Sequence, residues 1–260
     1  MSPPPLPPEL LDHVVDLLHD EMKVLKDCCL VSKSWIPRTR KHIFFHIEFC
    51  FSEDLQSWRN VFPCPSTSPA YYTQSLFIRC PSAVTTTDAE DGGWIPTFSR
   101  IVRLRMSFAG IGSGGLELPL VPLYRFSPTV KSLHMDFIIT APPSQILNLT
   151  YAFPLLEDLT VTTSRDGPID GHDKLPAAQP SNPPAFTGSL KLEGGMHHVA
   201  NQFLSLQSGL RFRELHLTWK HKGDISATIA LVEMCRYTLE SLNIVNGLNG
   251  TSSLHLHRYR

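Results

Sequence analysis

One short pattern recurs along this chain and restricts its fold more than any other feature. An apolar residue, a gap and a second apolar residue appear in seven strand-like segments, from "QSLFIRC" to "ESLNIVN". Periods of roughly 20 to 50 residues indicate architectures in which similar units stack on one another. The central leucines, separated by 28, 29, 26, 31, 25 and 27 residues, are Leu76, Leu104, Leu133, Leu159, Leu190, Leu215 and Leu242.

Alternation within each segment explains why such units need one another. The leucine and the residue two positions later share one face of a strand, and a single strand cannot bury that face alone. The spacing resembles that of leucine-rich repeats, although the asparagine of the usual consensus is mostly absent. We therefore predict an α/β fold in which residues 71–260 form a leucine-rich-repeat solenoid with a parallel sheet. Helical or extended returns, such as 143–157 and 197–212, are expected to cover its second side.

The residues between the leucines are expected to face outward on the open side of this sheet. Their mixed charge and single aromatic side chain suit a protein-recognition surface, although ordinary solvated strand faces explain the same pattern. The residues predicted to contact a target protein are Phe77, Arg103, Arg105, His134, Asp136, Lys191, Glu193 and His216, with Thr160, Thr218 and Asn243 beside them.

Two segments depart from the repeat. Residues 164–185 hold five prolines and few apolar residues, which predicts a flexible Pro-rich loop. That loop is either a contact arm or an insertion without a role. The chain also ends soon after the seventh unit without an evident polar cap, which stacked units normally need, so we expect a missing final segment.

The first 45 residues have a helical character instead. Residues 7–19 predict a helix whose apolar residues cover more than one narrow stripe, which indicates burial on two sides or a partner on one. A second helical pattern follows around Leu25. A third begins at "SKSWIP", with Ser32 or Ser34 as its cap and Pro37 in its first turn. Three short helices lie near the lower size limit for folding alone, so this unit is expected to need a neighbour.

The same residues resemble an F-box. The string Leu6-Pro7-x-Glu9-Leu10-Leu11 is followed by Leu25, by "CLVSKSW" and by Arg40-x-x-x-Phe44. The whole chain looks like the F-box proteins that basidiomycete fungi carry in large numbers. The resemblance implies docking on the Skp-family adaptor of a cullin–RING ubiquitin ligase. The residues it implies as forming or supporting that docking surface are Leu6, Pro7, Leu10, Leu11, Leu25, Leu30, Val31 and Trp35.

The expected organisation follows from these two patterns. Residues 5–47 form the F-box-like helical domain, residues 48–70 form a linker, and residues 71–260 form the repeat domain.

The stretch "CCLVSKSW", residues 28–35, allows two interpretations. Adjacent cysteines suggest a reactive thiol or a pair of metal ligands, yet the six cysteines of the chain form no Cys-x-x-Cys pair and no zinc-site spacing. Free cysteine commonly packs as a small apolar side chain. We therefore expect one of Cys28 and Cys29 to pack inward and the other to lie nearer the adaptor.

Charge and hydropathy exclude several classes of partner. A net charge of −1 gives no overall field to attract nucleic acid or an anionic membrane. No run of about 18 apolar residues exists, and the first residues lack the basic start of a secretory signal. We expect a protein of the cytoplasm, the nucleus or both, with reduced thiols and with neither nucleic acid nor membrane as a partner.

Two further patterns suggest other chemistry. Gly110–Gly115, "GIGSGG", satisfies the Gly-x-Gly-x-x-Gly spacing of dinucleotide sites directly after a strand-like segment. Pro119 and Pro122, however, would break the helix that this fingerprint requires. His255 and His257 lie two apart in a strand-like segment and are interpreted as a surface pair rather than as metal ligands.

We therefore predict a protein that is not an enzyme and that holds no cofactor. Its predicted role is the substrate-recognition subunit of an SCF-type cullin–RING E3 ubiquitin ligase, which would act by bringing a target protein close to the ubiquitin-charged enzyme. The alternatives are a nucleotide-dependent enzyme that uses the Gly110–Gly115 loop and an F-box scaffold outside a ligase.

Overall fold

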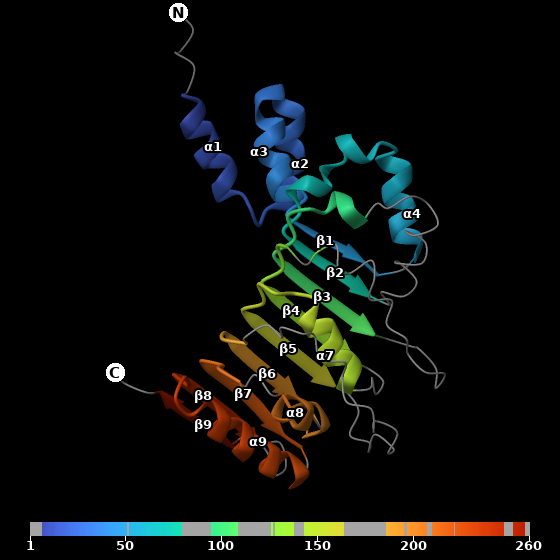
Figure 1. The fold of residues 1–260 in the computed structure, drawn as a ribbon. Helices are drawn as coiled ribbons and strands as arrows, with labels where there is room; N and C mark the ends of the chain where they lie inside the picture. Colours follow the sequence, from blue (N-terminus) through green and yellow to red (C-terminus); the bar gives the residue numbers. More distant parts are fainter. Residues whose placement is uncertain are drawn as a thin grey trace, which may run out of the picture.

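The described part of the chain contains one sheet whose strands follow one another in space as they do in sequence (Figure 1). The computed structural model describes residues 7–50, 52–79, 95–108, 126, 128–137, 143–163, 186–194, 197–206, 210–220, 222–246 and 252–257. Strands β1 to β8 are parallel, and β9 pairs antiparallel with β8. The strands are β1 (His46–Phe49), β2 (Ser75–Arg79), β3 (Arg103–Phe108), β4 (Ser132–Phe137), β5 (Asp158–Thr163), β6 (Ser189–Glu193), β7 (Glu214–Trp219), β8 (Ser241–Asn246) and β9 (Ser252–His257). The prediction of an α/β fold with a parallel sheet is confirmed.

The seven predicted leucines lie in one continuous row across this sheet. Each is paired in register with the leucine of the next strand, so that stacking buries them against one another. The row consists of Ile47, Leu76, Leu104, Leu133, Leu159, Leu190, Leu215, Leu242 and Leu256. The residues two positions later, or two positions earlier in the antiparallel β9, form a second row on the same face, as alternation requires. That row consists of Phe49, Ile78, Met106, Met135, Val161, Leu192, Leu217, Ile244 and Leu254.

A repeated hydrogen-bond pattern holds the amino edge of the sheet together. A carbonyl oxygen just before one strand accepts N–H groups from two consecutive residues that precede or begin the next strand. Gln74 O, for example, lies 2.8 Å from Val102 N and 2.9 Å from Arg103 N. We call this pattern the edge ladder; its acceptors are the carbonyls of Phe45, Gln74, Val102, Lys131, Gly188 and Arg213, together with that of Glu157, which accepts the single N–H of Ser189. The ladder joins neighbouring units at the residues that immediately precede their paired strands.

Helices cover the apolar face of the sheet. Figure 1 shows α7 (Pro143–Tyr151), α8 (His197–Leu204) and α9 (Lys222–Cys235) on the same side, while α4 (Ser52–Val61) lies beside the first strands. Phe153, Phe203 and Phe212 are fully buried between these helices and the strands. Helices α7 and α8 fall within the two predicted returns. None of the described helices is both long enough and apolar enough to cross a bilayer.

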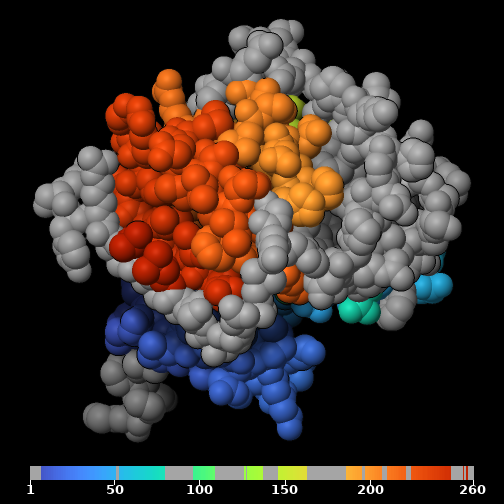
Figure 2. All heavy atoms as spheres, turned by 90° about the horizontal axis from the view of Figure 1, so that it is seen from below, coloured from blue at the N-terminus to red at the C-terminus, as the bar shows by residue number. Residues whose placement is uncertain are grey.

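Three short helices form a unit at the beginning of the chain, which we call the head. It consists of α1 (Pro8–Leu17), α2 (Met22–Val31), the short 3-10 helix η1 (Lys33–Trp35) and α3 (Ile36–Ile43). Pro37 lies in the first turn of α3, as predicted. Val15, Leu25 and Cys28 are buried here but do not belong to the apolar cluster that fills the rest of the molecule. Figure 2 shows the head, coloured blue, protruding from one side of the molecule.

The expected linker over 48–70 is not a linker. Strand β1 pairs with β2 along four residue pairs, and α4 packs its Trp58 against Phe44 and Phe49 with ring centroids 6.0 and 6.1 Å apart. Two 3-10 helices, η2 (Pro65–Thr67) and η3 (Pro69–Tyr72), follow. The sequence pattern missed this unit because Ile47 stands where later units have leucine. The sheet therefore starts at His46, directly after the head.

Candidate functional site

Two groups of apolar side chains on the head are exposed. Leu10, Val14 and Leu17 lie four and three residues apart along α1, so they share one face of that helix, and they are 52%, 47% and 68% exposed. Leu30 and Val31 end α2 and are 86% and 69% exposed. Small proteins seldom leave so many large aliphatic side chains in water within one short segment without a partner.

The residues that the F-box resemblance implies divide into exposed and supporting positions. Pro7, Leu10, Leu30 and Val31 are exposed, and Leu11 and Trp35 are half-buried. Leu25 is fully buried, so it supports the head from inside and cannot itself contact a partner. Leu6 lies outside the described residues.

The stretch "CCLVSKSW" has a packing role. Cys28 is buried in the head, whereas Cys29 is half-buried, with its Sγ 2.9 Å from Oγ1 of Thr39. The Thr39 hydroxyl donates to the carbonyl of Trp35 at 2.8 Å, so the thiol is the donor to threonine. Ser32 caps the 3-10 helix η1, because its Oγ accepts the N–H of Ser34 at 3.3 Å, whereas α3 begins after Trp35 without a side-chain cap, so the prediction that a serine caps this third helix is wrong.

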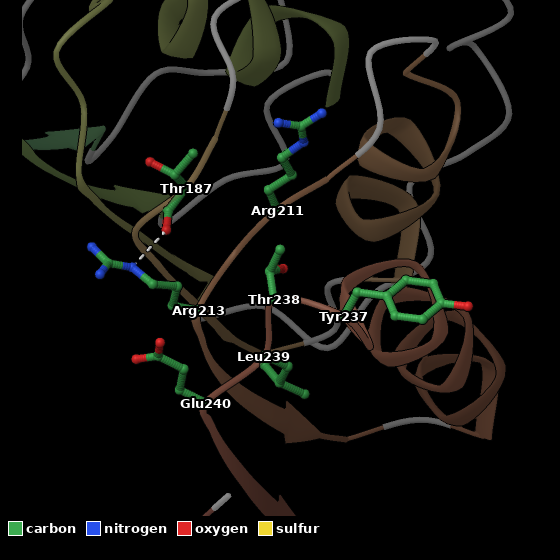
Figure 3. A pocket seen from close by; sticks show the side chains of 7 residues that line it. All are labelled: Thr187, Arg211, Arg213, Tyr237, Thr238, Leu239 and Glu240. Atoms are coloured by element: carbon green, nitrogen blue, oxygen red, sulfur yellow. Dashed lines mark hydrogen bonds between the residues drawn. The ribbon is translucent and has the colours of Figure 1, made fainter. Parts of the chain in front are cut away.

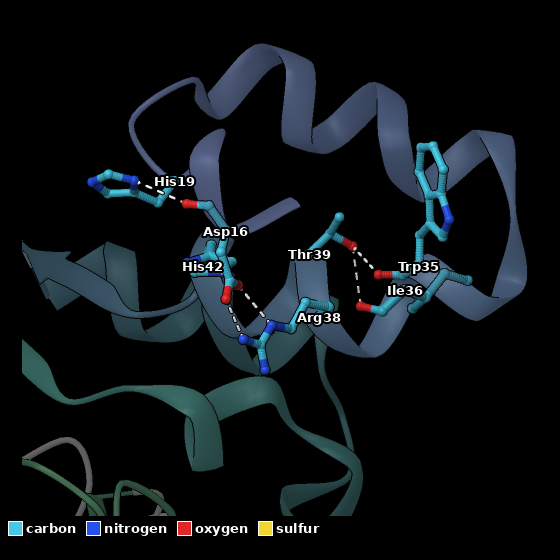
Figure 4. Close-up of polar contacts among 7 residues, drawn as sticks. All are labelled: Asp16, His19, Trp35, Ile36, Arg38, Thr39 and His42. Atoms are coloured by element: carbon cyan, nitrogen blue, oxygen red, sulfur yellow. Dashed lines mark hydrogen bonds and ion pairs between the residues drawn. The ribbon is translucent and has the colours of Figure 1, made fainter. Parts of the chain in front are cut away.

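An ion-pair network joins α1 to α3 (Figure 4). Nε of Arg38 lies 2.6 Å from Oδ1 of Asp16, and a terminal nitrogen of the same guanidinium donates to Oδ2. Nε2 of His42 lies 2.7 Å from Oδ1. The hydrogen bonds from Arg38, with a smaller contribution from His42, hold the pKa of the Asp16 carboxyl well below its usual range. These contacts set the angle at which α1 presents its exposed apolar face.

Replacing Asp16 with asparagine is expected to destabilise the head by about 1 kcal/mol, because the partly exposed pair is screened by water. The pKa of Asp16 is depressed in the folded chain, so its contribution is present above the ordinary value, about pH 4, and declines as the pH falls below it. Hydrogen exchange of the amides of α1 and α3 measures this effect. The difference in exchange rate between Asp16→Asn and the unaltered chain should shrink below pH 4. Asp20→Asn, at an 85% exposed side chain, is the control, and its exchange rates should stay close to those of the unaltered chain both above and below pH 4.

The eight residues predicted to contact a target lie on the open face of the sheet, opposite the leucine rows. Phe77, Arg105, His134, Lys191 and His216 belong to one row across this face. Asp136 and Glu193 lie two positions further along their strands, and Arg103 lies two positions before Arg105. The structure thus brings together residues that are more than 100 positions apart in the sequence.

Much of the charge on this open face is neutralised within the chain. The guanidinium of Arg105 donates to Oδ2 of Asp136 at 2.7 and 2.9 Å and lies 5.1 Å from the ring centroid of Phe77. Nε2 of His134 lies 2.7 Å from the other oxygen of Asp136, and Lys191 pairs with Glu193 at 2.9 Å. Burial alone would raise the pKa of Asp136, but the hydrogen bonds from His134 and Arg105 outweigh it and lower the pKa.

The patterns that suggested other chemistry find little support in the described residues. The Gly110–Gly115 loop and the Pro-rich stretch 164–185 lie outside them. Doubly wound sheets bind dinucleotides where the strand order reverses, and the order of β1 to β9 contains no reversal. His255 and His257 lie on β9, and the part of the chain that is described contains no cluster of three or more histidine, cysteine or acidic residues suited to a metal ion.

One pocket was not predicted from the sequence. It has a volume of about 300 Å³ and opens at the amino edge of β6 to β8, away from the predicted residues on the open face. No repeat position marks it, because its lining comes from three segments that precede β6, β7 and β8 (Figure 3).

Comparisons of this chain with family models, with curated proteins and with solved structures find no match.

Proposed function

We propose that this chain is the substrate-recognition subunit of an SCF-type cullin–RING E3 ubiquitin ligase. In this proposal the head is an F-box that binds the Skp-family adaptor, and the sheet with its helices is a leucine-rich-repeat solenoid that binds a target protein. The observation that carries the proposal is the exposure of Leu10, Leu30 and Val31. These are apolar side chains in water at positions where the F-box resemblance implies contact.

The physical chemistry of the head supports an apolar docking surface. Burying one large aliphatic side chain contributes about 1.5–3 kcal/mol, so a few such residues supply most of the affinity of an ordinary interface. The Asp16–Arg38 pair joins α1, which carries Leu10, to α3, and its two charges are matched within the head. Binding is therefore expected to depend only weakly on salt.

The open face of the sheet supports target binding in a different way. Its row of side chains from Phe77 to Asn243 is mixed in chemistry and is carried on strands that the edge ladder holds in place. Rigid side chains lose little entropy when they bind. The subunit needs no chemistry of its own, because holding a lysine beside a charged enzyme converts a rare encounter into an effectively intramolecular one.

Substitution of Leu30 with aspartate is expected to weaken adaptor binding at least about tenfold. An aspartate in an apolar interface loses the aliphatic contact and must also be desolvated. Because Leu30 is 86% exposed in the free chain, the change should leave the head folded. The matched control is Ile229→Asp, an equally drastic change at a 58% exposed position on α9, far from the head.

Co-expression of each variant with the Skp-family adaptor, followed by purification through the adaptor, measures the effect. The proposal requires that the Leu30→Asp variant no longer copurifies with the adaptor and that the Ile229→Asp variant still does. Recovery of both variants at the level of the unaltered chain contradicts adaptor docking by this surface. Copurification of the cullin subunit with the unaltered chain distinguishes a ligase subunit from a scaffold that binds the adaptor alone.

A further inference from the structure

The two end strands of the sheet differ in how well their apolar residues are covered. At the β1 end, Ile47 and Phe49 are 8% and 3% exposed, and Trp58 of α4 packs its ring against Phe49. At the β9 end, Leu254 and Leu256 are 53% and 52% exposed, although they continue the same two apolar rows. The apolar face of the sheet is therefore closed at its first strand and open at its last.

Strand β9 also has an unpaired edge. It pairs with β8 on one side, and none of the described strands lies on its other side. Such an edge presents backbone N–H and C=O groups that can pair with another chain, and many proteins prevent this with lysine or proline on the edge strand. The segment Ser252–His257 contains neither of these residues and no acidic residue. Nothing in the sequence of this strand therefore opposes the addition of a further strand.

The two leucines of β9 determine which added strand fits best. A second copy of β9 can run antiparallel to the first, related by a two-fold axis that passes through the pair formed by position 255 and its copy. Leu254 then stands opposite Leu256 of the second copy, and Leu256 opposite Leu254. Both apolar rows continue on the same face from one copy into the other, as they already do between β8 and β9. A shift of the pairing by two residues would place only one leucine of each copy opposite a leucine.

The closed β1 end limits this mode of assembly to two copies. Pairing of β9 with β1 of another copy would be head-to-tail and would produce an open filament. The apolar residues of β1 are already covered, however, so β1 offers no exposed leucine row to match β9. Two-fold pairing through β9 uses the open end of both copies at once and leaves none for a third.

We propose that the full chain forms a two-fold symmetric homodimer through the outer edge of β9, so that the sheets of the two copies become one. The two β1 strands then lie about 80 Å apart along this sheet, at about 4.8 Å per strand. The heads are at its far ends, so their exposed apolar residues stay uncovered. The dimer requires neither an adaptor nor a target protein, and it is independent of the ligase function proposed above.

Sedimentation velocity of the full chain at increasing concentration tests the proposal. One six-residue strand buries little surface, so we expect a reversible dimer, of about twice the 29.2 kDa of the chain, with a dissociation constant of about 10 µM. Leu254→Asp should weaken dimerisation at least about tenfold, because the two-fold axis places the unfavourable charge in the interface twice. The matched control is Leu155→Asp, at a 50% exposed leucine between α7 and β5, which should dimerise like the unaltered chain.

Disulfide cross-linking tests the register without altering the leucines. His255→Cys places a thiol opposite its own copy, where the Cα atoms of an antiparallel pair are about 4.5–5.5 Å apart, within the range of a disulfide. Ser253→Cys is the matched control, because position 253 and its copy are separated by four residues along the strands, about 14 Å, which no disulfide spans. Both variants carry Cys64→Ser as well, since the Cys64 thiol is exposed. Rapid cross-linking of His255→Cys and little cross-linking of Ser253→Cys is the expected result.

Three outcomes overturn the proposal. The first is a chain that remains monomeric at about ten times the expected dissociation constant. The second is a dimer that Leu254→Asp and Leu155→Asp affect equally, with circular dichroism showing both variants folded, because another surface would then form the interface. The third is cross-linking of Ser253→Cys as fast as that of His255→Cys, which would exclude the two-fold pairing at position 255.

Discussion

Alanine in place of Gly188 is expected to lower the free energy of unfolding by about 3 kcal/mol or more. A Cβ atom built on Gly188 lies 1.6 Å from the carbonyl oxygen of Glu157, which is backbone and cannot rotate away. That oxygen is an acceptor of the edge ladder and receives the N–H of Ser189 at 2.7 Å. The methyl group must therefore displace two neighbouring units from each other, which is the kind of backbone conflict that produces the largest effects of single substitutions.

Urea denaturation of Gly188→Ala against the unaltered chain measures this loss. The sign is informative, because glycine to alanine changes at unstrained positions usually stabilise a protein by about 0.4–1 kcal/mol. Thr187→Ala, at the exposed neighbouring position, provides the control and should cost little. A Gly188→Ala variant as stable as the unaltered chain would show that Glu157 and Gly188 do not approach each other as described.

The second large effect is expected at the centre of the head. Leu25→Ala removes a fully buried side chain from a unit whose other buried apolar residues are Val15 and Cys28. Such truncations cost about 2–5 kcal/mol, and a core this small has few neighbours that can move into the cavity. We expect the head to unfold locally while the sheet remains intact, because Leu25 does not belong to the apolar cluster that fills the rest of the molecule.

Hydrogen exchange separates these two regions. In Leu25→Ala, amides of α1 to α3 should exchange far faster than in the unaltered chain, while amides of β3 to β7 should keep their protection. Leu10→Ala, at a position 52% exposed, is the matched control and should leave both regions protected. Loss of protection throughout the sheet in Leu25→Ala would mean that the head and the sheet unfold as one cooperative unit.

The strands at the centre of the sheet could be predicted because each repeats the same local physics. A leucine and an apolar residue two positions later need a covered face, and only stacking with similar units provides one. Strand β1 escaped prediction because Ile47 replaces the leucine. The segment of His255 and His257 was expected to be strand-like, but its antiparallel pairing with β8 was not predicted. Helix α9 was missed since apolar residues occur on several of its sides, with Leu231 buried and Ile229 exposed.

The exposed surface of the head and the pocket also differ in how much of each a local sequence pattern can predict. The exposed residues of the head are contiguous in sequence, so a resemblance over one segment could indicate them. The pocket depends instead on connections that lie 24 to 29 residues apart, as between Thr187, Arg211 and Glu240. Their proximity arises from the in-register stacking of β6, β7 and β8. It also depends on the burial of Phe212, which decides where its neighbours point. No pattern within any single unit contains that information.

The sequential order of the strands also sets the distance between the head and the pocket along the amino edge of the sheet. The head joins the amino end of β1, and the pocket lies at the amino end of β7, six strand positions away on the same edge. At a spacing of about 4.8 Å between strands, the two lie about 29 Å apart. A peptide that reached from one to the other would need at least about nine extended residues. Insertion or loss of one unit between them would change that span by about 5 Å, so the number of units determines which partners can engage both ends.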